Sequence, residues 1–384
     1  MKILAFTYGH PEAHGALISS ILSISENAKH VDFYYKNNFE ITYNFPVNIR
    51  FIPNSIKIIP EEKLLKSNKI YKFFHFLKFT IKFMKLRSLY KYDLIYIIDP
   101  IALSSYYIST LFFKSNSKTW YHNYDPIYKN NGISILSVTY LAYFINRLSY
   151  KKIDYFTLPM IERLKYFNVN NFKFGYNIIP NYPNLKLHRS KPHTLQNNII
   201  KLVFVGSVGI GRGLEEIIDL LNVKINNYEI QLHIKGYLDS KYKNILMNRA
   251  KFKNSTKNLF FHEFGPWEEV PIKIRNCDIG LAFYDRNSIM TSTLGLGGST
   301  KIFQYIGEGL PVIVDNDFKI KYLLNYDWAV GIDLNMNSIV NSLEYILSNY
   351  NEFSNKALND FNNTFNCNQY YNTSFKHLFP TISE

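Results

Sequence analysis

The alternation of strands and helices in this sequence starts twice. The first run opens with an apolar strand at residues 3–6, a turn and a helix at 16–24. Further strand-like runs, separated by helical stretches, follow at 31–35, 94–98, 118–122 and 155–158. A second run begins at 201–206 and continues with strands at 230–234, 259–262, 278–283 and 311–314. Strands that alternate with helices form parallel, doubly wound sheets, so the sequence predicts an α/β protein with two such domains.

A polar segment separates the two runs. Residues 184–198, NLKLHRSKPHTLQNN, lack periodicity, as is typical of an interdomain linker. We therefore expect a first domain at 1–183, the linker at 184–198 and a second domain at 199–365. Two such domains face a central cleft, where ligands bind at the carboxyl ends of the strands.

The strongest local signal lies at residues 299–314, STKIFQYIGEGLPVIV. Apolar residues recur at helical spacing, two glycines end the helix, and a β-branched run predicts a buried parallel strand. The glycine-rich stretch 295–298 precedes this helix, and Lys301 adds a positive charge. Backbone N–H groups of such a loop bind anions, which indicates a diphosphate site. The alternative is an ordinary helix–strand unit with a flexible loop.

The composition is that of a folded protein with an excess of positive charge. Of 384 residues, 47% are hydrophobic and 19% charged, with 44 Lys and Arg against 30 Asp and Glu. The net charge of +14 favours an acidic partner, either nucleic acid, anionic lipid or a phosphorylated substrate, although codon bias could also enrich lysine. The aromatic residues fall mostly at core positions and no nucleic-acid-binding motif occurs, so we expect no nucleic-acid partner.

Cysteine usage and hydropathy indicate where the protein works. Cys277 and Cys367 are the only cysteines, with no disulfide or zinc pattern, which favours a reducing compartment. The N-terminus does not read as a signal peptide. The most hydrophobic window, 93–113, is split by Asp99-Pro100 and predicts a strand, a loop and a helix rather than a membrane span. We expect a cytoplasmic protein, peripheral at the inner face of the cell membrane.

Residues 68–91 predict a helix with basic and apolar sides. Lys78, Lys82 and Lys85 share a narrow face, while phenylalanine, leucine, isoleucine and methionine cover the rest. A basic, aromatic amphipathic helix suits an anionic membrane surface. The alternative is a helix packed between the sheet and its neighbours.

Four motifs in order resemble those of the GT-B glycosyltransferases, specifically the large family 4 type that extends bacterial surface polysaccharides. They are Ile178-Ile179-Pro180-Asn181, VFVGSVGIGRGLEEII at 203–218, FHEFGPWEEVPIKIRNCDIGLAFY at 261–284, and STKIFQYIGEGLPVIV at 299–314. The resemblance implies two Rossmann-like domains, with residues 366–384 returning to the first as a terminal helix. It also implies a hexosyltransferase that uses a UDP- or GDP-linked sugar, without metal or another cofactor. The acceptor is then a lipid-linked or growing surface glycan, of the capsule, O-antigen or lipopolysaccharide kind.

The resemblance assigns a donor-binding role to a set of residues, most of them in the second domain. They are Gly9, Gly206, Ser207, Arg212, Gly213, Gly236, Phe264, Gly298, Ser299, Thr300, Lys301 and Gln304. Arg212 matches a family lysine at the donor diphosphate, and its guanidinium can bind phosphate through two hydrogen bonds. Ser207 stands where the family often has a second basic residue.

Two departures weaken the resemblance. Gln304 replaces the glutamate that commonly holds the nucleotide ribose, and its amide can exchange hydrogen bonds but carries no charge. Leu296 replaces a second glutamate, and Glu308 lies four residues after Gln304, in the turn. A degenerate, non-catalytic homologue that acts as a binding or partner subunit is therefore the alternative function.

The catalytic candidates lie in the first domain. His122 ends a predicted strand and resembles the family histidine that contacts the donor sugar. His14 and Glu12 flank the first turn, where a general base would be needed if the reaction inverts. The resemblance favours retention, although the residues themselves do not decide between the two courses.

Two other enzyme classes fit less well. Asp315-Asn316-Asp317 matches the metal-binding D-x-D of the other major glycosyltransferase fold, but it follows a late strand and reads as a loop and helix cap. A nucleotide-sugar epimerase or dehydrogenase needs a G-x-G-x-x-G after its first strand, and neither half of the chain has that spacing.

Overall fold

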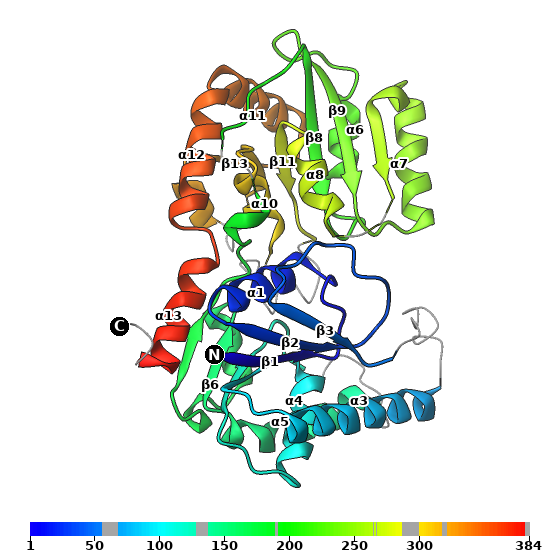
Figure 1. Cartoon of the computed structure of the whole chain (residues 1–384). Helices are drawn as coiled ribbons and strands as arrows, with labels where there is room; N and C mark the ends of the chain where they lie inside the picture. The colour runs from blue at the N-terminus through cyan, green and yellow to red at the C-terminus, as the bar shows by residue number, and fades with distance from the viewer. Residues whose placement is uncertain are drawn as a thin grey trace. The chain divides into compact units, whose positions relative to one another are not determined.

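The chain folds into two compact units. The computed structural model describes residues 1–55, 68–127, 137–188, 191–263, 265, 267–285, 299–316 and 321–380. Unit 1 comprises Met1–Pro180 with Cys367–Glu384, and unit 2 comprises Asn181–Asn366. Each unit contains one parallel sheet with helices on both faces (Figure 1). The predicted α/β class with two doubly wound domains is confirmed.

The sheet of unit 1 has seven strands in the order β3-β2-β1-β4-β5-β6-β7, and every neighbouring pair is parallel. The strands are β1 (Lys2–Thr7), β2 (His30–Tyr35), β3 (Ile49–Pro53), β4 (Leu94–Ile98), β5 (Lys118–His122), β6 (Tyr155–Leu158) and β7 (Tyr176–Ile178). The helices are α1 (Gly15–Glu26), α3 (Lys69–Leu89), α4 (Pro100–Thr110), α5 (Val138–Ser149) and α13 (Asn368–Leu378), and the 3₁₀ helices are η1 (Tyr150–Lys152), η2 (Ile161–Tyr166) and η3 (Val169–Asn171).

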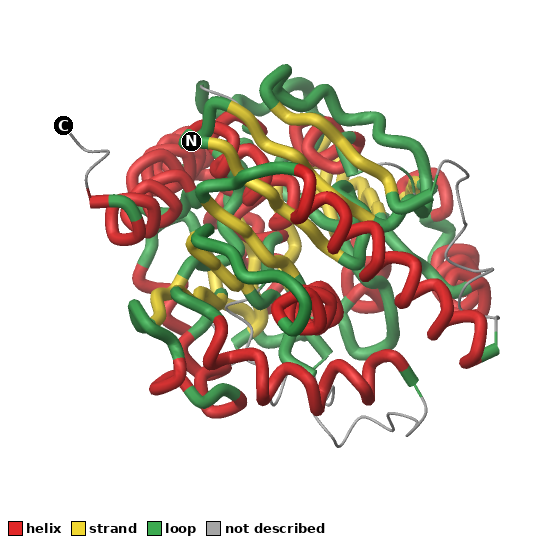
Figure 2. Tube along the Cα trace, turned by 60° about the horizontal axis from the view of Figure 1, so that its bottom comes forward, coloured by secondary structure: helices red, strands yellow, loops and turns green. Residues whose placement is uncertain are grey.

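Successive side chains of β5 point to opposite faces of this sheet. Tyr121 packs with the phenylalanines of α3 and with α4 in one hydrophobic cluster. Trp120 points to the opposite face, where its ring lies 5.6 Å from that of Tyr371 in α13. Figure 1 shows α3, α4 and α5 together on one face, and Figure 2 brings this layer toward the viewer. Helices α1 and α13 pack against each other on the other face.

The sheet of unit 2 has six strands in the order β10-β9-β8-β11-β12-β13, all parallel. The strands are β8 (Ile199–Val205), β9 (Glu229–Lys235), β10 (Leu259–His262), β11 (Ile279–Ala282), β12 (Val312–Asp315) and β13 (Ala329–Ile332). The helices are α6 (Leu214–Leu220), α7 (Ser240–Phe252), α8 (Glu269–Arg275), α10 (Lys301–Gly307), α11 (Met336–Ser348) and α12 (Tyr350–Asn363). The 3₁₀ helices are η4 (Leu185–Leu187), η5 (Thr256–Asn258) and η6 (Lys321–Asn325). The cores on the two sheet faces involve α6, α7 and α11 on one side and α8, α10 and α12 on the other.

The segment expected to be a linker packs on unit 2. Nδ1 of His188 lies 3.0 Å from the buried Glu308 carboxylate, and Nε2 of His193 lies 2.9 Å from Asp278. Polar composition alone could not reveal these contacts, because each involves a carboxylate about a hundred residues later in the chain. From Cys367 onward the chain belongs to unit 1, where Cys367 Sγ lies 3.2 Å from Ser23 Oγ in α1.

Candidate functional site

Two glycines meet where β8 and β9 end. The Gly206 N–H donates to the Lys235 carbonyl at 3.0 Å. Gly206 and Gly236 have φ angles of +110° and +151°, a region that favours glycine. A Cβ on Gly236 would lie 1.9 Å from the Gly206 carbonyl oxygen, so a side chain cannot fit there. The close backbone approach fixes the start of loop 206–213, which ends at Gly213 before α6.

Lys301 is a buried cation at the start of α10. Its side chain is packed between two aromatic faces, with Nζ 4.2 Å from the ring centre of Phe204 and 4.4 Å from that of Tyr284. Nζ donates a hydrogen bond of 3.2 Å to the carbonyl of Phe283. Burial is the main reason that the pKa of Lys301 lies well below its usual value. The nearby positive charge of Arg212 lowers this pKa further, and the Asp315 carboxylate partly offsets the lowering. Within the described residues no carboxylate lies within ion-pair distance of Nζ.

Arg212 supplies a second positive charge to the same region. It lies in the glycine loop, is half-buried, and makes no ion pair with any described residue. Its charge lowers the pKa of Lys301 and partly offsets the rise that burial causes in the pKa of Tyr284. Two like charges near one another, neither of them ion-paired with a described carboxylate, attract an anion.

The other predicted donor residues differ in their surroundings. Ser299 accepts a 2.7 Å hydrogen bond from the Tyr284 hydroxyl, and Thr300 precedes α10. Gln304 is buried one turn after Lys301, and no hydrogen bond joins its side chain to another described residue. Ser207 is exposed beside Gly206. Phe264 and Gly298 lie outside the described residues.

Glu308 is committed to holding unit 2 together. Both of its oxygens are buried, and Arg275 donates to them at 2.9 and 3.1 Å. His188 Nδ1 lies 3.0 Å from the same carboxylate. Burial raises the pKa of Glu308, but the bonds from His188 and Arg275 outweigh it and lower the pKa. Glu308 therefore cannot replace the missing glutamate at position 304.

His122 is buried in unit 1 at the end of β5. Its Nδ1 lies 2.8 Å from the Thr157 hydroxyl, and its ring packs edge-on against Tyr124. Burial, together with the neighbouring His14 and Arg163, lowers the pKa of His122 to about 3. The imidazole is therefore neutral at physiological pH and is a poor proton acceptor there.

The other first-domain candidates mostly have structural partners. Glu12 accepts hydrogen bonds from the backbone N–H groups of Thr42 and Tyr43, at 2.8 and 2.6 Å, and from the Thr42 hydroxyl at 3.1 Å. His14 caps α1 by accepting from the Leu17 N–H at 3.2 Å, with its side chain exposed. Gly9 lies in the turn after β1, where its carbonyl accepts from Lys36. Their catalytic or donor roles remain predictions.

The sequence did not single out the aromatic walls around Lys301. Phe204 is the last but one residue of β8, two residues before Gly206, and Tyr284 follows β11. Both residues precede a loop at the carboxyl edge of the sheet, and this position was the one sequence feature that could have identified them. Their contact with Lys301 depends on the fold. Within the described residues no group of three or more histidine, cysteine, aspartate or glutamate side chains could hold a metal ion.

Comparison with known protein families and with curated proteins finds no match. Solved structures match over the whole chain. A sucrose-phosphate synthase from Thermosynechococcus elongatus has a TM-score of 0.66 at 14% identity, covering 99% of this chain and 98% of that one. Anabaena HepE, solved with UDP-glucose, has a TM-score of 0.61 at 12% identity, covering 98% and 99%. The lipopolysaccharide outer core galactosyltransferase WaaB has a TM-score of 0.57 at 12% identity, covering 99% of each chain. At these identities the likeness concerns the fold, and the chain has the GT-B fold that the sequence motifs implied.

Proposed function

We propose that this protein is a glycosyltransferase that binds a nucleoside-diphosphate sugar in unit 2. The observation that carries the proposal is the pair Lys301 and Arg212, two cations without a carboxylate partner among the described residues, beside the glycine loop 206–213. A buried ammonium is costly unless a counter-charge accompanies it. A diphosphate supplies that charge and fits the loop, whose glycines let the backbone approach closely.

The same charges suit the transfer reaction. When the bond between sugar and diphosphate breaks, negative charge grows on the leaving phosphate oxygen. Lys301 and Arg212 stabilise that charge through a low-dielectric surface, where fixed charges act strongly. We propose that these two side chains supply the positive charge that the reaction needs, without a metal ion. The Gln304 amide is free to exchange hydrogen bonds with the ribose hydroxyls.

The course of the reaction is proposed to be retaining. An inverting transfer needs a base on the face of the sugar opposite the leaving group. Burial keeps His122 neutral and weakly basic, while Glu12 is held by loop residues Thr42 and Tyr43. His14 is then the one remaining candidate, and two of the three expected bases are poorly suited to inversion.

Two of the structural neighbours support a nucleotide-sugar donor. Anabaena HepE was solved with UDP-glucose, and the trehalose-6-phosphate protein of E. coli with UDP-2-fluoro glucose. Both share the fold of this chain, and neither shares more than 12% of its sequence. We propose that the donor here is UDP- or GDP-linked.

The proposed acceptor is a lipid-linked or growing surface glycan, reached from the inner face of the cell membrane. WaaB, one of the neighbours, acts on the lipopolysaccharide outer core. Within the described residues no helix is long and apolar enough to cross a bilayer. Peripheral contact through α3 is the proposed route, and its exposed residues Phe74 and Ile81 support it.

Thermal unfolding with UDP, GDP, CDP and TDP, each with and without magnesium, tests the donor site. A site filled to about 100 times its dissociation constant adds roughly 2.7 kcal/mol of stability. We expect one nucleotide to stabilise the protein, independently of magnesium, and Arg212→Met to abolish the effect. Arg249→Met is the matched control, because Arg249 is also in unit 2 but pairs with Asp219.

The absence of a shift with every nucleotide would overturn the donor site. A shift without hydrolysis or transfer of the matching nucleotide sugar would instead favour the non-catalytic homologue, to which Gln304 and Leu296 point.

A further inference from the structure

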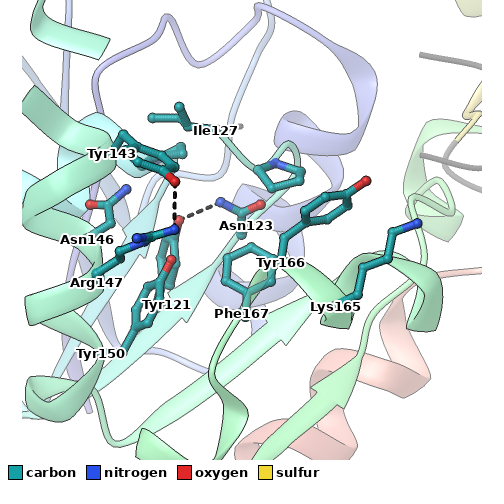
Figure 3. A pocket seen from close by; sticks show the side chains of 12 residues that line it. Tyr121, Asn123, Ile127, Tyr143, Asn146, Arg147, Tyr150, Lys165, Tyr166 and Phe167 are labelled. Carbon is teal, nitrogen blue, oxygen red and sulfur yellow. Dashed lines mark hydrogen bonds between the residues drawn. The ribbon is translucent and has the colours of Figure 1, made fainter. Parts of the chain in front are cut away.

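Unit 1 contains a cavity that the donor site does not use. It lies at the carboxyl ends of β4 and β5, between α5 and η2, and has a volume of about 190 Å³ (Figure 3). A single water needs about 10–15 Å³ by this kind of measure, so the cavity has room for a ring-sized molecule. It opens on the face of the sheet that carries Tyr121, whereas His122 points to the other face.

The floor of the cavity is polar and buried. Asn123 donates through Nδ2 to the hydroxyl of Tyr121, while its Oδ1 is buried without a hydrogen-bond partner among the described residues. Asn123 is 1% exposed. Exchanging the two amide atoms would place Nδ2 where Oδ1 lies, so an unsatisfied polar atom remains there in either orientation. Most buried polar atoms are hydrogen-bonded, so this atom offers a hydrogen-bonding position to a water molecule or a ligand.

Two more polar groups converge on this floor. Asn146 accepts a 3.1 Å hydrogen bond from Ser104 through Oδ1, which holds its amide in place. Tyr150 lies beside Tyr121, and Figure 3 shows both phenols directed toward Arg147. A ligand with several hydroxyl groups can satisfy such a set, whereas a hydrocarbon would leave these groups unpaired.

The rim of the cavity is aromatic and positively charged. Arg147 donates a 2.6 Å hydrogen bond to the Tyr143 hydroxyl, and its guanidinium lies 4.6 Å from that ring's centre. Lys165 is exposed on η2, with Nζ 5.2 Å from the ring centre of Tyr166. Neither cation has an ion pair with a described residue. The twelve residues that line the cavity include no aspartate or glutamate.

We propose that this cavity binds a sugar ring that carries a negative charge, as a carboxylate or a phosphate group. Asn123 Oδ1 accepts from a ring hydroxyl, Tyr166 and Phe167 cover an apolar face of the ring, and Arg147 and Lys165 bind the anion. The identification of this sugar with part of the glycan acceptor rests on the proposed transferase function. The binding of a charged sugar in this cavity does not rest on the transferase function, because the cavity and Arg212 belong to different units.

Saturation-transfer NMR on the full chain tests the proposal with glucuronate, glucose 6-phosphate and glucose as observed ligands. Inorganic phosphate has no C–H protons to observe, so it is added as a competitor of glucose 6-phosphate. We expect both charged sugars to bind, with glucose and inorganic phosphate at least tenfold weaker. Arg147→Met should weaken the charged sugars about tenfold and leave glucose unchanged, because the exposed Arg147 side chain contributes charge. Asn123→Leu should weaken all three sugars. Lys114→Met, an exposed lysine of unit 1 that does not line the cavity, is the matched control and should change nothing.

Three outcomes would overturn the proposal: no binding of either charged sugar, equal binding of glucose, or inorganic phosphate binding as tightly as glucose 6-phosphate. Circular dichroism separates misfolding of Asn123→Leu from loss of the site, and Arg147→Met gives an independent result at the exposed rim. The thermal shift induced by each of the four nucleotides is measured on the same samples. If no nucleotide shifts the melting temperature but the charged sugars bind, the proposed function is refuted and the cavity proposal stands. If a nucleotide shifts the melting temperature but the charged sugars do not bind, the cavity proposal is refuted and the proposed function stands.

Discussion

At the scale of single residues, two buried lysines among the described residues of unit 2 are in opposite situations. Lys235 is 5% exposed, and its Nζ donates to the Glu263 carbonyl at 2.7 Å and to the Glu269 carboxylate. Lys301 is 8% exposed but has one carbonyl and two aromatic rings instead of a carboxylate. Burial of a charge without a counter-charge destabilises a folded protein. Lys301 therefore lowers the stability of the ligand-free protein, and a bound anion would offset this loss.

Replacing Lys301 with methionine should therefore separate stability from binding. Methionine keeps most of the volume between Phe204 and Tyr284 and removes the charge. We expect Lys301→Met to raise the free energy of unfolding by about 1–3 kcal/mol without ligand and to abolish stabilisation by the nucleotide. Urea unfolding with and without UDP measures both. Lys235→Met, which removes a paired lysine, should lower stability and keep the nucleotide effect, and a destabilised Lys301→Met would contradict this account.

Buried histidines in unit 1 predict how stability depends on pH. Burial lowers the pKa of His122 to about 3 and that of His10 to about 4, with Phe39 partly offsetting the latter. Both are neutral in the folded state at pH 5, whereas a histidine in the unfolded chain, with a pKa near about 6.5, binds a proton there. The unfolded state thus binds more protons, so stability falls as the pH falls from about 6.5 toward 4.

Each histidine should contribute about 2 kcal/mol of this loss between pH 7 and pH 5. His122→Asn should reduce the loss by about that amount, measured as the difference in unfolding free energy at the two pH values. His377→Asn, at an exposed histidine of α13, is the control. An unchanged pH dependence in His122→Asn would show that this ring is protonated in the folded protein.

At the scale of elements, α3 shows what a hydrophobic pattern can and cannot predict. The helix was expected at 68–91 and spans Lys69–Leu89, because Asn68 caps its start and the 3.6-residue period is long. Its wide apolar arc is divided by the fold: Phe76, Phe79 and Phe83 enter the core of unit 1, while Phe74 and Ile81 remain exposed. The pattern predicts the helix but not which part of the arc the sheet covers, since that depends on α4 and α5.

The exposed part of α3 should bind anionic membranes. Phe74 and Ile81 are 64% and 65% exposed, and the neighbouring Lys78 and Lys85 are exposed as well. We expect the full chain to sediment with vesicles that contain anionic lipid but not with neutral ones, because apolar burial and charge attraction add together. The double variant Phe74→Ser with Ile81→Ser should weaken this binding about tenfold. Ile245→Ser, at an exposed isoleucine of α7 in unit 2, should have no effect, and equal binding of the double variant would exclude α3 as the contact.

Short strands and long-range contacts mark the limit of sequence reasoning. The ten predicted strands all exist, but the sheets also contain β3, β7 and β13, which were missed. β7 has three residues, too few to show a period of two. At the candidate site, a motif could point to Lys301 and Arg212. Nothing local could show that Phe204 and Tyr284 enclose Lys301, or that Glu308 is bonded to Arg275 and His188, because sheet order brings them together.

At the scale of the whole molecule, the end of the chain completes the unit that its beginning starts. Tyr371 of α13 is buried, and its hydroxyl lies 2.9 Å from that of Tyr96 in β4 and within hydrogen-bond distance of Ser20 in α1. Its ring also packs near Trp120. Unit 2 lies entirely between these two parts in the sequence and has its own cores. Each unit thus has enough packed interior to melt as a cooperative element of its own.

Calorimetry of a Tyr371 variant should reveal this division. Tyr371→Ala leaves a cavity in unit 1 and should lower its stability by about 3–5 kcal/mol, whereas Tyr371→Phe removes one hydroxyl and should cost about 1 kcal/mol. We expect the variant with alanine to show two heat-absorption transitions, of which the lower belongs to unit 1. UDP should raise only the other transition, because Lys301 and Arg212 lie in unit 2. A single transition that moves as a whole with both UDP and Tyr371→Ala would mean that the two units unfold together, and the donor site would then report on the stability of the entire chain.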